Sequence, residues 1–211
     1  MADLETDDEK VEAIKAWWKA NGLSVFAGVA IGLGAVFAWR GWVNYHTSVA
    51  QRASIAFEQL LATSASDGAE SVQMQAKAIN DDYGSTPYAM FADLAVAKVR
   101  VEAGELEAAT KALESAVAQA PEPGLAKLAA LRLARVLIAR GEYGQAKKVI
   151  DAHDDGGAFA ADFSALQGDI AAAEGRTDAA RTAYQAAIDG GAGDARLLEL
   201  KLRDLPAEGQ S

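Results

Sequence analysis

Hydrophobic positions are concentrated in one long stretch near the N-terminus and follow helical spacing in the rest of the chain. Residues 20–39 form a run of twenty positions without a charge. As a helix this run is about 30 Å long, which matches the hydrocarbon core of a membrane. Tryptophans, which favour the membrane interfaces, flank both ends of the run at Trp17, Trp18, Trp39 and Trp42. The pattern predicts a transmembrane helix over residues 23–42.

Two other interpretations of this run explain less. A buried helix of a soluble protein accounts for the length but not for the tryptophans at both ends. A cleaved signal peptide begins with a short basic region, whereas residues 1–22 hold six acids and three lysines. The small-residue triplet at residues 48–50 lies too far beyond the run for ordinary cleavage. We therefore expect an uncleaved anchor that follows an acidic, disordered tail over residues 1–22.

Basic residues on the two sides of the span bear on its orientation. Three lysines precede the span, and two arginines, Arg40 and Arg52, follow it. Cytoplasmic flanks of membrane helices carry the excess of basic residues. This small difference favours a cytoplasmic N-terminus.

Small residues line one face of the span, at Gly28, Gly32 and Ala35. Such residues let a second membrane helix approach closely, which is how helices associate inside a bilayer. Glycine is also common in membrane helices that have no such partner. The spacing therefore suggests a face for packing against a second helix. A membrane helix without a partner remains the alternative.

The chain after the span has the pattern of two further helical segments. Apolar residues recur at three- and four-residue steps, which predicts that the first helix continues to about Thr63. The break SASDG ends it, and a second helix is expected from Ala69 to Asp82. A loop then leads to Pro87, which is typical of a helix start. Residues 43–87 are therefore expected to form membrane-proximal helices.

A short motif repeats through the rest of the chain. GELEAA begins at Gly104, GEYGQA at Gly141 and GRTDAA at Gly175, so the intervals are 37 and 34 residues. A helix–turn–helix period near 34 residues is typical of tetratricopeptide-like repeats. The glycine ends one helix, and the alanines let the next helix pack closely. The sequence predicts an all-α protein, with a tetratricopeptide-like α-solenoid of helical hairpins after the transmembrane helix.

The solenoid is expected over residues 88–205, and its repeats are irregular. Asp93 stands where the repeat pattern requires a large apolar residue, and His153 stands at a small-residue position. The last segment, from Asp194 to Leu205, has the pattern of a helix that caps the exposed end of the stack.

Composition and motifs argue against several kinds of chemistry. The chain has no cysteine, which excludes disulfides and cysteine-bound metals, and its net charge of −10 argues against binding to nucleic acid. The two histidines, His46 and His153, are far apart in sequence. The pairs Asp81–Asp82 and Asp154–Asp155 lack the spacing of a calcium loop. We expect no catalytic residue, no cofactor and no metal.

A binding surface is the remaining expectation. The first helices of successive hairpins form the concave face of such a solenoid, which suits peptides or partner helices. The helical register predicts a partner groove lined by Phe91, Leu94, Lys98, Val101, Leu128, Leu131, Arg135 and Ile138. The apolar members of this set also fit the core between the repeats.

Two segments of the chain resemble a known family. VEAIKAWWKANG over residues 11–22 and AWRGW over residues 38–42, followed by a degenerate repeat body, are similar to the YfgM family of ancillary subunits of the bacterial Sec translocon. The resemblance implies a single-pass protein of the bacterial inner membrane, with a cytoplasmic N-terminus and a periplasmic repeat domain. It also implies association with SecYEG and with PpiD, a membrane-anchored periplasmic folding factor. The family has no catalytic motif to carry over.

The expected function is therefore that of a non-enzymatic, membrane-anchored scaffold with a chaperone-like role. Its repeat domain would bind partner proteins or unfolded secreted chains as they emerge from the translocon. The same anchor and repeats would also serve an assembly factor of a different envelope complex, for cytochrome maturation or cell-wall synthesis. Only the identity of the partners separates these alternatives.

Overall fold

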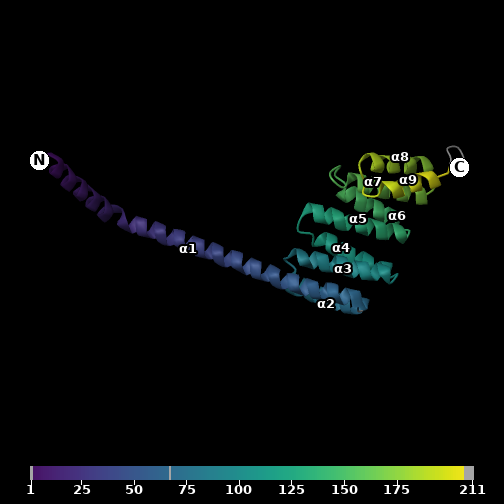
Figure 1. Cartoon of the computed structure of the whole chain (residues 1–211), viewed down its shortest axis with the longest axis horizontal. Helices are drawn as coiled ribbons and strands as arrows, with labels where there is room; N and C mark the ends of the chain where they lie inside the picture. The colour runs from purple at the N-terminus through teal and green to yellow at the C-terminus, as the bar shows by residue number, and fades with distance from the viewer. Residues whose placement is uncertain (1, 67, 207–211) are drawn as a thin grey trace. The chain divides into compact units, whose positions relative to one another are not determined.

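The computed structural model describes residues 2–66 and 68–206, with side chains over residues 9–64 and 68–206. Within these residues the chain is entirely helical apart from its turns, which confirms the predicted all-α fold (Figure 1). The chain divides into two units, residues 1–49 and residues 50–211. The helices are α1 (Ala2–Ser66), α2 (Ala69–Tyr83), α3 (Pro87–Glu102), α4 (Leu106–Ala118), α5 (Pro123–Ala139), α6 (Tyr143–His153), α7 (Ala160–Ala173), α8 (Thr177–Asp189) and α9 (Ala195–Asp204).

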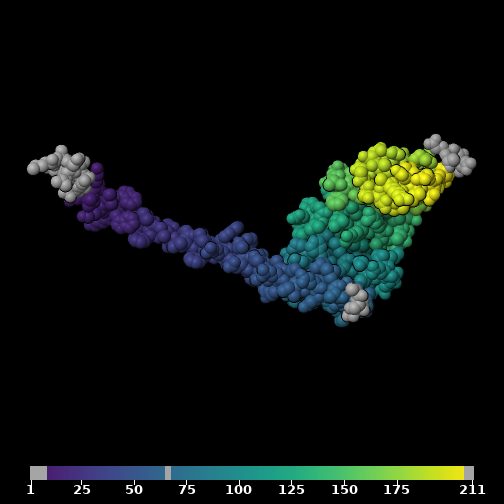
Figure 2. All heavy atoms as spheres, in the orientation of Figure 1, coloured from purple at the N-terminus to yellow at the C-terminus, as the bar shows by residue number. Residues whose placement is uncertain are grey.

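Helix α1 contains the apolar run. An 18-residue window of α1 has a mean hydropathy of 1.9, and 6% of that window is buried, so the helix is long and apolar enough to cross a membrane. In Figure 2 the atoms of this run form one narrow column, the width of a single helix. A helix that is apolar and also bare of protein contacts has the surface expected for contact with lipid.

The N-terminal residues differ from the disordered tail that the sequence suggests. Helix α1 already begins at Ala2 and runs without a break into the apolar segment. A helix that is propagated from a stable apolar segment needs no new nucleation, which is the costly step for a short helix.

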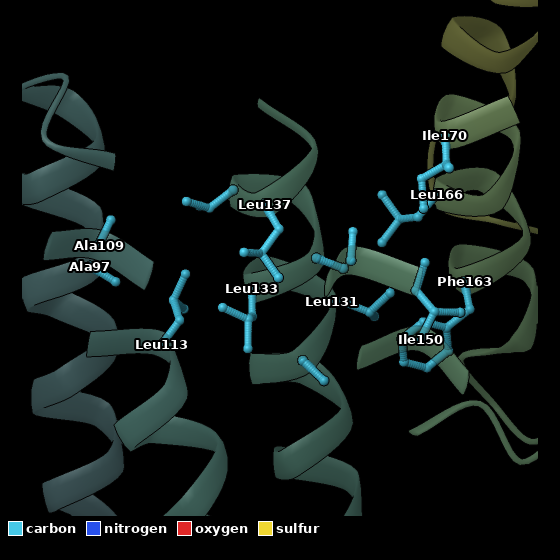
Figure 3. Close-up of a cluster of buried hydrophobic side chains, with 14 residues drawn as sticks. Ala97, Ala109, Leu113, Leu131, Leu133, Leu137, Ile150, Phe163, Leu166 and Ile170 are labelled. Atoms are coloured by element: carbon cyan, nitrogen blue, oxygen red, sulfur yellow. The ribbon is translucent and has the colours of Figure 1, made fainter. Parts of the chain in front are cut away.

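Residues 50–211 form a stack of antiparallel helices (Figure 1). Leu60 of α1 is fully buried with Val72 of α2 and Val96 of α3. The largest core cluster joins α3, α4, α5, α6 and α7, and contains Leu113, Leu137 and Phe163 (Figure 3). Each helix is thus covered by apolar residues of its neighbours, as in a solenoid.

The repeated glycines end the first helix of each hairpin. Gly104, Gly141 and Gly175 have φ values of 76°, 76° and 73°, a left-handed conformation that favours glycine. After each glycine the next N–H donates to a carbonyl five residues back, as from Glu105 to Arg100 at 2.8 Å. This is the hydrogen bond of a Schellman turn, which satisfies the last carbonyls of the helix. The motif in the sequence is therefore a repeated helix end.

Buried Asp93 explains one irregularity of the repeats. It is 6% exposed on α3 and accepts hydrogen bonds from Asn80 Nδ2 of α2 and from Gln119 Nε2 after α4, each at 2.8 Å. A polar residue takes an apolar position here because both of its oxygens have donors, which offsets the cost of burial. Burial raises the pKa of Asp93, and hydrogen bonds from Ser115 and Asn80 partly oppose this rise.

Replacing Asp93 by asparagine is expected to destabilise the stack by about 1–3 kcal/mol, because the asparagine amide cannot accept from both Asn80 and Gln119. The raised pKa means that the folded protein holds the Asp93 proton more tightly than the unfolded chain. The stability that this tighter proton binding contributes is fully present below the pKa that Asp93 has in the unfolded chain. It is lost as the pH rises through the pKa that Asp93 has in the folded protein. The stability difference between the wild type and Asp93→Asn should therefore widen as the medium is acidified through this window.

Urea unfolding of both proteins at neutral and at mildly acidic pH measures this difference. The control is the substitution Asp151→Asn, at an exposed acid of α6. The stability difference between this variant and the wild type should be the same at both pH values. A gap between wild type and Asp93→Asn that shrinks on acidification would contradict the assignment.

The C-terminal end of the stack is closed by α9. Leu198 is buried against the cluster that contains Tyr184 of α8. The Tyr184 hydroxyl donates to Asp169 Oδ1 at 2.8 Å, and Lys201 Nζ of α9 donates to the same oxygen at 2.6 Å. Burial, followed by the bond to Asp169, raises the pKa of Tyr184 well above its usual range. The tyrosine ring also needs Gly168, where a Cβ would lie 2.5 Å from it.

Candidate functional site

A groove with a volume of about 720 Å³ opens on the surface of the unit formed by residues 50–211. It lies across the end of α1 and the helices α3, α4 and α5. Its lining residues are Phe57, Leu61, Ser64, Phe91, Leu94, Ala95, Ala97, Lys98, Val101, Glu102, Leu113, Leu128, Arg132, Arg135 and Val136. The surface is predominantly apolar, with charged side chains among the lining residues, which is the general make-up of a binding site.

Helix α3 contributes its four predicted residues to this groove. Phe91, Leu94, Lys98 and Val101 follow one another at three- and four-residue steps and therefore share one helix face. Thr86 and Pro87 start the helix, and the Gly104 turn ends it, so both ends of this face are defined by local sequence. The opposite face of α3, with Asp93, is buried in the stack.

Helix α5 contributes only part of its predicted set. Leu128 and Arg135 line the groove, but Leu131 and Ile138 do not. Leu131 is 3% exposed in the main core cluster, and Figure 3 shows it on the side of α5 that faces Ile150 and Phe163. Ile138 packs against the same cluster.

Arg132 takes the place that the sequence pattern gave to Leu131. Residues 128, 132 and 135 follow a four- and then a three-residue step, which is as regular as the predicted series. The sequence contains both series because α5 is apolar on more than one side. Only the packing of α6 and α7 decides between them.

The end of α1 supplies a wall that the sequence analysis did not assign to the groove. Phe57 and Leu61 line it, and the Phe57 ring lies 6.1 Å from the ring of Phe91, centre to centre. Their helical spacing is visible in the sequence, but it predicts only that one face of α1 is buried. It does not identify α3 as the neighbour.

Charge is unevenly distributed around the groove. Lys98 Nζ lies 3.7 Å from Glu102 Oε1, in an exposed pair one helical turn apart. Arg132 and Arg135 are exposed, and neither forms an ion pair with a residue that the structure describes. In contrast, residues 50–211 as a whole hold 24 acids and 16 bases, a net charge of −8. The groove is thus a locally basic part of an acidic unit.

The residues considered for catalysis or metal binding are held in ordinary structural roles. His46 lies 4.5 Å from Trp42, ring centre to ring centre, and His153 Nδ1 lies 2.8 Å from the Val149 carbonyl oxygen. Asp154 and Asp155 accept hydrogen bonds from the backbone N–H groups of the two following glycines, and Asp155 also pairs with Lys127 at 2.6 Å. Within the described residues there is no group of three acids or histidines suited to a metal ion.

The small-residue face of α1 is open. A Cβ at Gly28 or at Gly32 would have no described atom within 4 Å other than its own helix, and Ala35 is exposed. The backbone is therefore accessible to another helix along this face. Helix pairing through Gly28, Gly32 and Ala35 stays a prediction.

Comparison with known proteins gives one family and several relatives. The family model described as a tetratricopeptide repeat-like domain matches residues 15–207. The chain is 30% identical over 206 residues to an ancillary SecYEG translocon subunit of Aggregatibacter actinomycetemcomitans, with 97% of this chain and all of the relative covered. Proteins with the same name are 29% identical in Haemophilus influenzae, over 97% of this chain and all of the relative, and 28% identical in Escherichia coli, over 97% and 99%.

No solved structure matches the chain. The relatives extend over both the apolar helix and the repeats, so the two parts occur together in them as they do here. Together with the apolar segment of α1 they indicate a membrane-anchored protein. With a helical-repeat model that covers most of the chain and relatives that match it almost end to end, this chain belongs to the tetratricopeptide repeat-like YfgM family.

Proposed function

We propose that this chain is a non-enzymatic ancillary subunit of the Sec translocon, with a chaperone-like role carried by its repeat domain. The similarity to three proteins of that name over 97% of the chain is the observation that supports this most strongly. The groove on the repeat unit supplies a surface for partner proteins or for unfolded chains. Catalysis plays no part in this proposal.

The proposed topology places the repeat domain in the periplasm of a bacterium and the N-terminus in the cytoplasm. The excess of lysines before the span supports this orientation. The anchor then tethers the repeat domain to the membrane, where secreted chains emerge in an unfolded state. Tethering raises the effective concentration of a binding site for such chains, even where each contact is weak.

The proposed partners are SecYEG and a PpiD-like folding factor that is itself anchored in the inner membrane. Two surfaces support such an assembly: the open small-residue face at Gly28 and Gly32, and the groove on the repeat unit. A helix of a partner would pack on the first, because small residues allow close approach of the backbones. Protein segments outside the membrane would bind to the second.

Affinity purification of the tagged full-length protein from detergent-solubilised inner membranes tests the proposal. Translocon subunits and the PpiD-like factor are expected in the eluate. Subunits of a cytochrome-maturation or cell-wall complex in place of the translocon would overturn it. Protease added to intact spheroplasts should degrade the repeat domain and spare the N-terminus, whereas a protected repeat domain would overturn the proposed orientation.

A further inference from the structure

Two arginines on α5 define a site for negative charge at the groove. Arg132 and Arg135 line it, are exposed, and form no ion pair with a described residue. They are three residues apart, so their backbones are about 4.5 Å apart along the helix axis. Several other cations of the same unit are paired, as Lys127 is with Asp155 and Arg140 with Glu142. The two guanidinium groups therefore have free donors for a partner.

Three apolar residues of the groove lining keep surface that is exposed to water. Leu61 is 47% exposed and Val101 is 42% exposed. Leu128 is half-buried, yet it belongs to none of the four clusters formed by the described core residues. These side chains come from α1, α3 and α5, so they surround the groove on several sides. Their contact area with water is available to a partner.

We infer that this groove binds an amphipathic helix of a partner protein, with two carboxylates one helical turn apart that pair with Arg132 and Arg135. This inference rests on the proposed function and names the kind of partner that its groove takes. The apolar face of the bound helix covers Leu61, Val101 and Leu128. The carboxylates lie beside that face and accept hydrogen bonds from the guanidinium groups.

A helix fits this lining better than an extended chain does, because of its backbone. An extended segment presents an unpaired N–H and C=O at every residue, and the side chains on the groove floor, such as Leu94, Ala97 and Leu113, offer no hydrogen bonds to them. A helix has already paired these groups within itself.

The spacing of the two arginines fits a helical partner. Carboxylates at positions i and i+3 or i+4 of a helix are separated by about 4.5–6 Å along the axis, close to the separation of the arginines.

The surrounding charge makes this recognition selective. The unit carries a net charge of −8, so an acidic partner is repelled everywhere except where local cations reverse the sign. A basic amphipathic helix would meet two unpaired arginines at the groove itself. Repulsion of acidic partners elsewhere on the unit and repulsion of basic helices at the groove act together. The groove therefore prefers a helix with acidic residues beside its apolar face.

Binding of synthetic peptides to the full-length protein in detergent micelles tests this inference by fluorescence anisotropy. The probe is a labelled amphipathic helix of about five turns, with apolar residues at i, i+3, i+4 and i+7 and two glutamates one turn apart beside them. The double variant Arg132→Glu with Arg135→Glu should bind it about tenfold more weakly. A peptide with lysines in place of the two glutamates should recover binding to that variant, a result that a merely structural defect would not give.

Three controls make the outcome specific. The variant Lys147→Glu with Lys148→Glu changes two exposed cations of α6 by the same charge and should bind the probe as the wild type does. The variant Val101→Ser with Leu128→Ser should weaken binding of every peptide. A probe of equal composition with a central proline, which cannot remain a regular helix, should bind at least tenfold more weakly than the helical probe.

Equal binding of the helical and proline-containing probes would overturn the inference, as would unchanged binding by the double arginine variant. A dimer of the wild-type protein that the double arginine variant dissociates would assign the groove to a second copy, and would also overturn it. Failure of the proposed function is distinguishable: translocon subunits would then be missing from the purified protein although the arginine-dependent peptide binding persists.

Discussion

Aspartate at both Val29 and Val36 is expected to remove the protein from the membrane. These valines are 55% and 53% exposed in the apolar run and lie on either side of its centre. A carboxylate near the middle of a membrane helix costs about 3 kcal/mol, so two cost roughly 6 kcal/mol and shift the partition by about 10⁴-fold. Alkaline carbonate extraction of membranes, followed by immunoblotting, should find the wild type in the pellet and the double variant in the supernatant.

The matched control changes two other exposed apolar residues by the same charge. Ile55 is 56% exposed on the later part of α1, and Met74 is 68% exposed on α2, both outside the predicted span. The variant Ile55→Asp with Met74→Asp should stay in the pellet. If the double variant at Val29 and Val36 also resists carbonate, the apolar run is not the anchor.

Replacing Phe163 by alanine is expected to give the largest loss of stability in the repeat unit. Phe163 is fully buried in the cluster that joins α5, α6 and α7 and is the largest fully buried side chain of the described residues. Truncation loses its transfer free energy and leaves a cavity between helices that are held by other contacts, at a cost of about 3–5 kcal/mol. The melting temperature should fall by about 10 °C.

Thermal unfolding followed by circular dichroism in detergent measures this fall. The exposed residue Leu200 of α9, 45% exposed, serves as the control. Leu200→Ala should change the free energy of unfolding by less than about 0.5 kcal/mol. Equal melting temperatures for Phe163→Ala and the wild type would mean that α7 does not pack on α5 and α6 as Figure 3 shows.

Helix α5 contributes to both the core and the groove. Leu131 and Phe163 hold the core side of this helix, whereas Leu128, Arg132 and Arg135 face the groove. A variant that loosens the core side therefore also disturbs the groove, although it touches none of the binding residues. Peptide-binding variants should be compared at a temperature well below the melting point, so that loss of fold is not read as loss of contact.

Much of the architecture follows from local patterns in the sequence. The charge-free run specifies a membrane-length helix because its length matches the hydrocarbon core and its bordering tryptophans match the two interfaces. Gly104, Gly141 and Gly175 specify helix ends because only glycine adopts the left-handed conformation without strain. The spacing of these ends predicts the hairpins. The face of α3 that lines the groove, from Phe91 to Val101, is predicted by the same helical period.

The sequence by itself thus determined the helices that follow the predicted tail, the helix ends at the repeated glycines and the solenoid, since each depends on residues that are close along the chain. Only the tertiary structure decided which side of α5 lies in the groove, since Leu131 and Arg132 both fit a helical series and the packing of α6 and α7 selects between them. It also decided that Asp93 is buried, because its hydrogen-bond donors, Asn80 and Gln119, come from other segments of the chain. Contacts between distant segments depend on the position of whole helices, which no local period specifies.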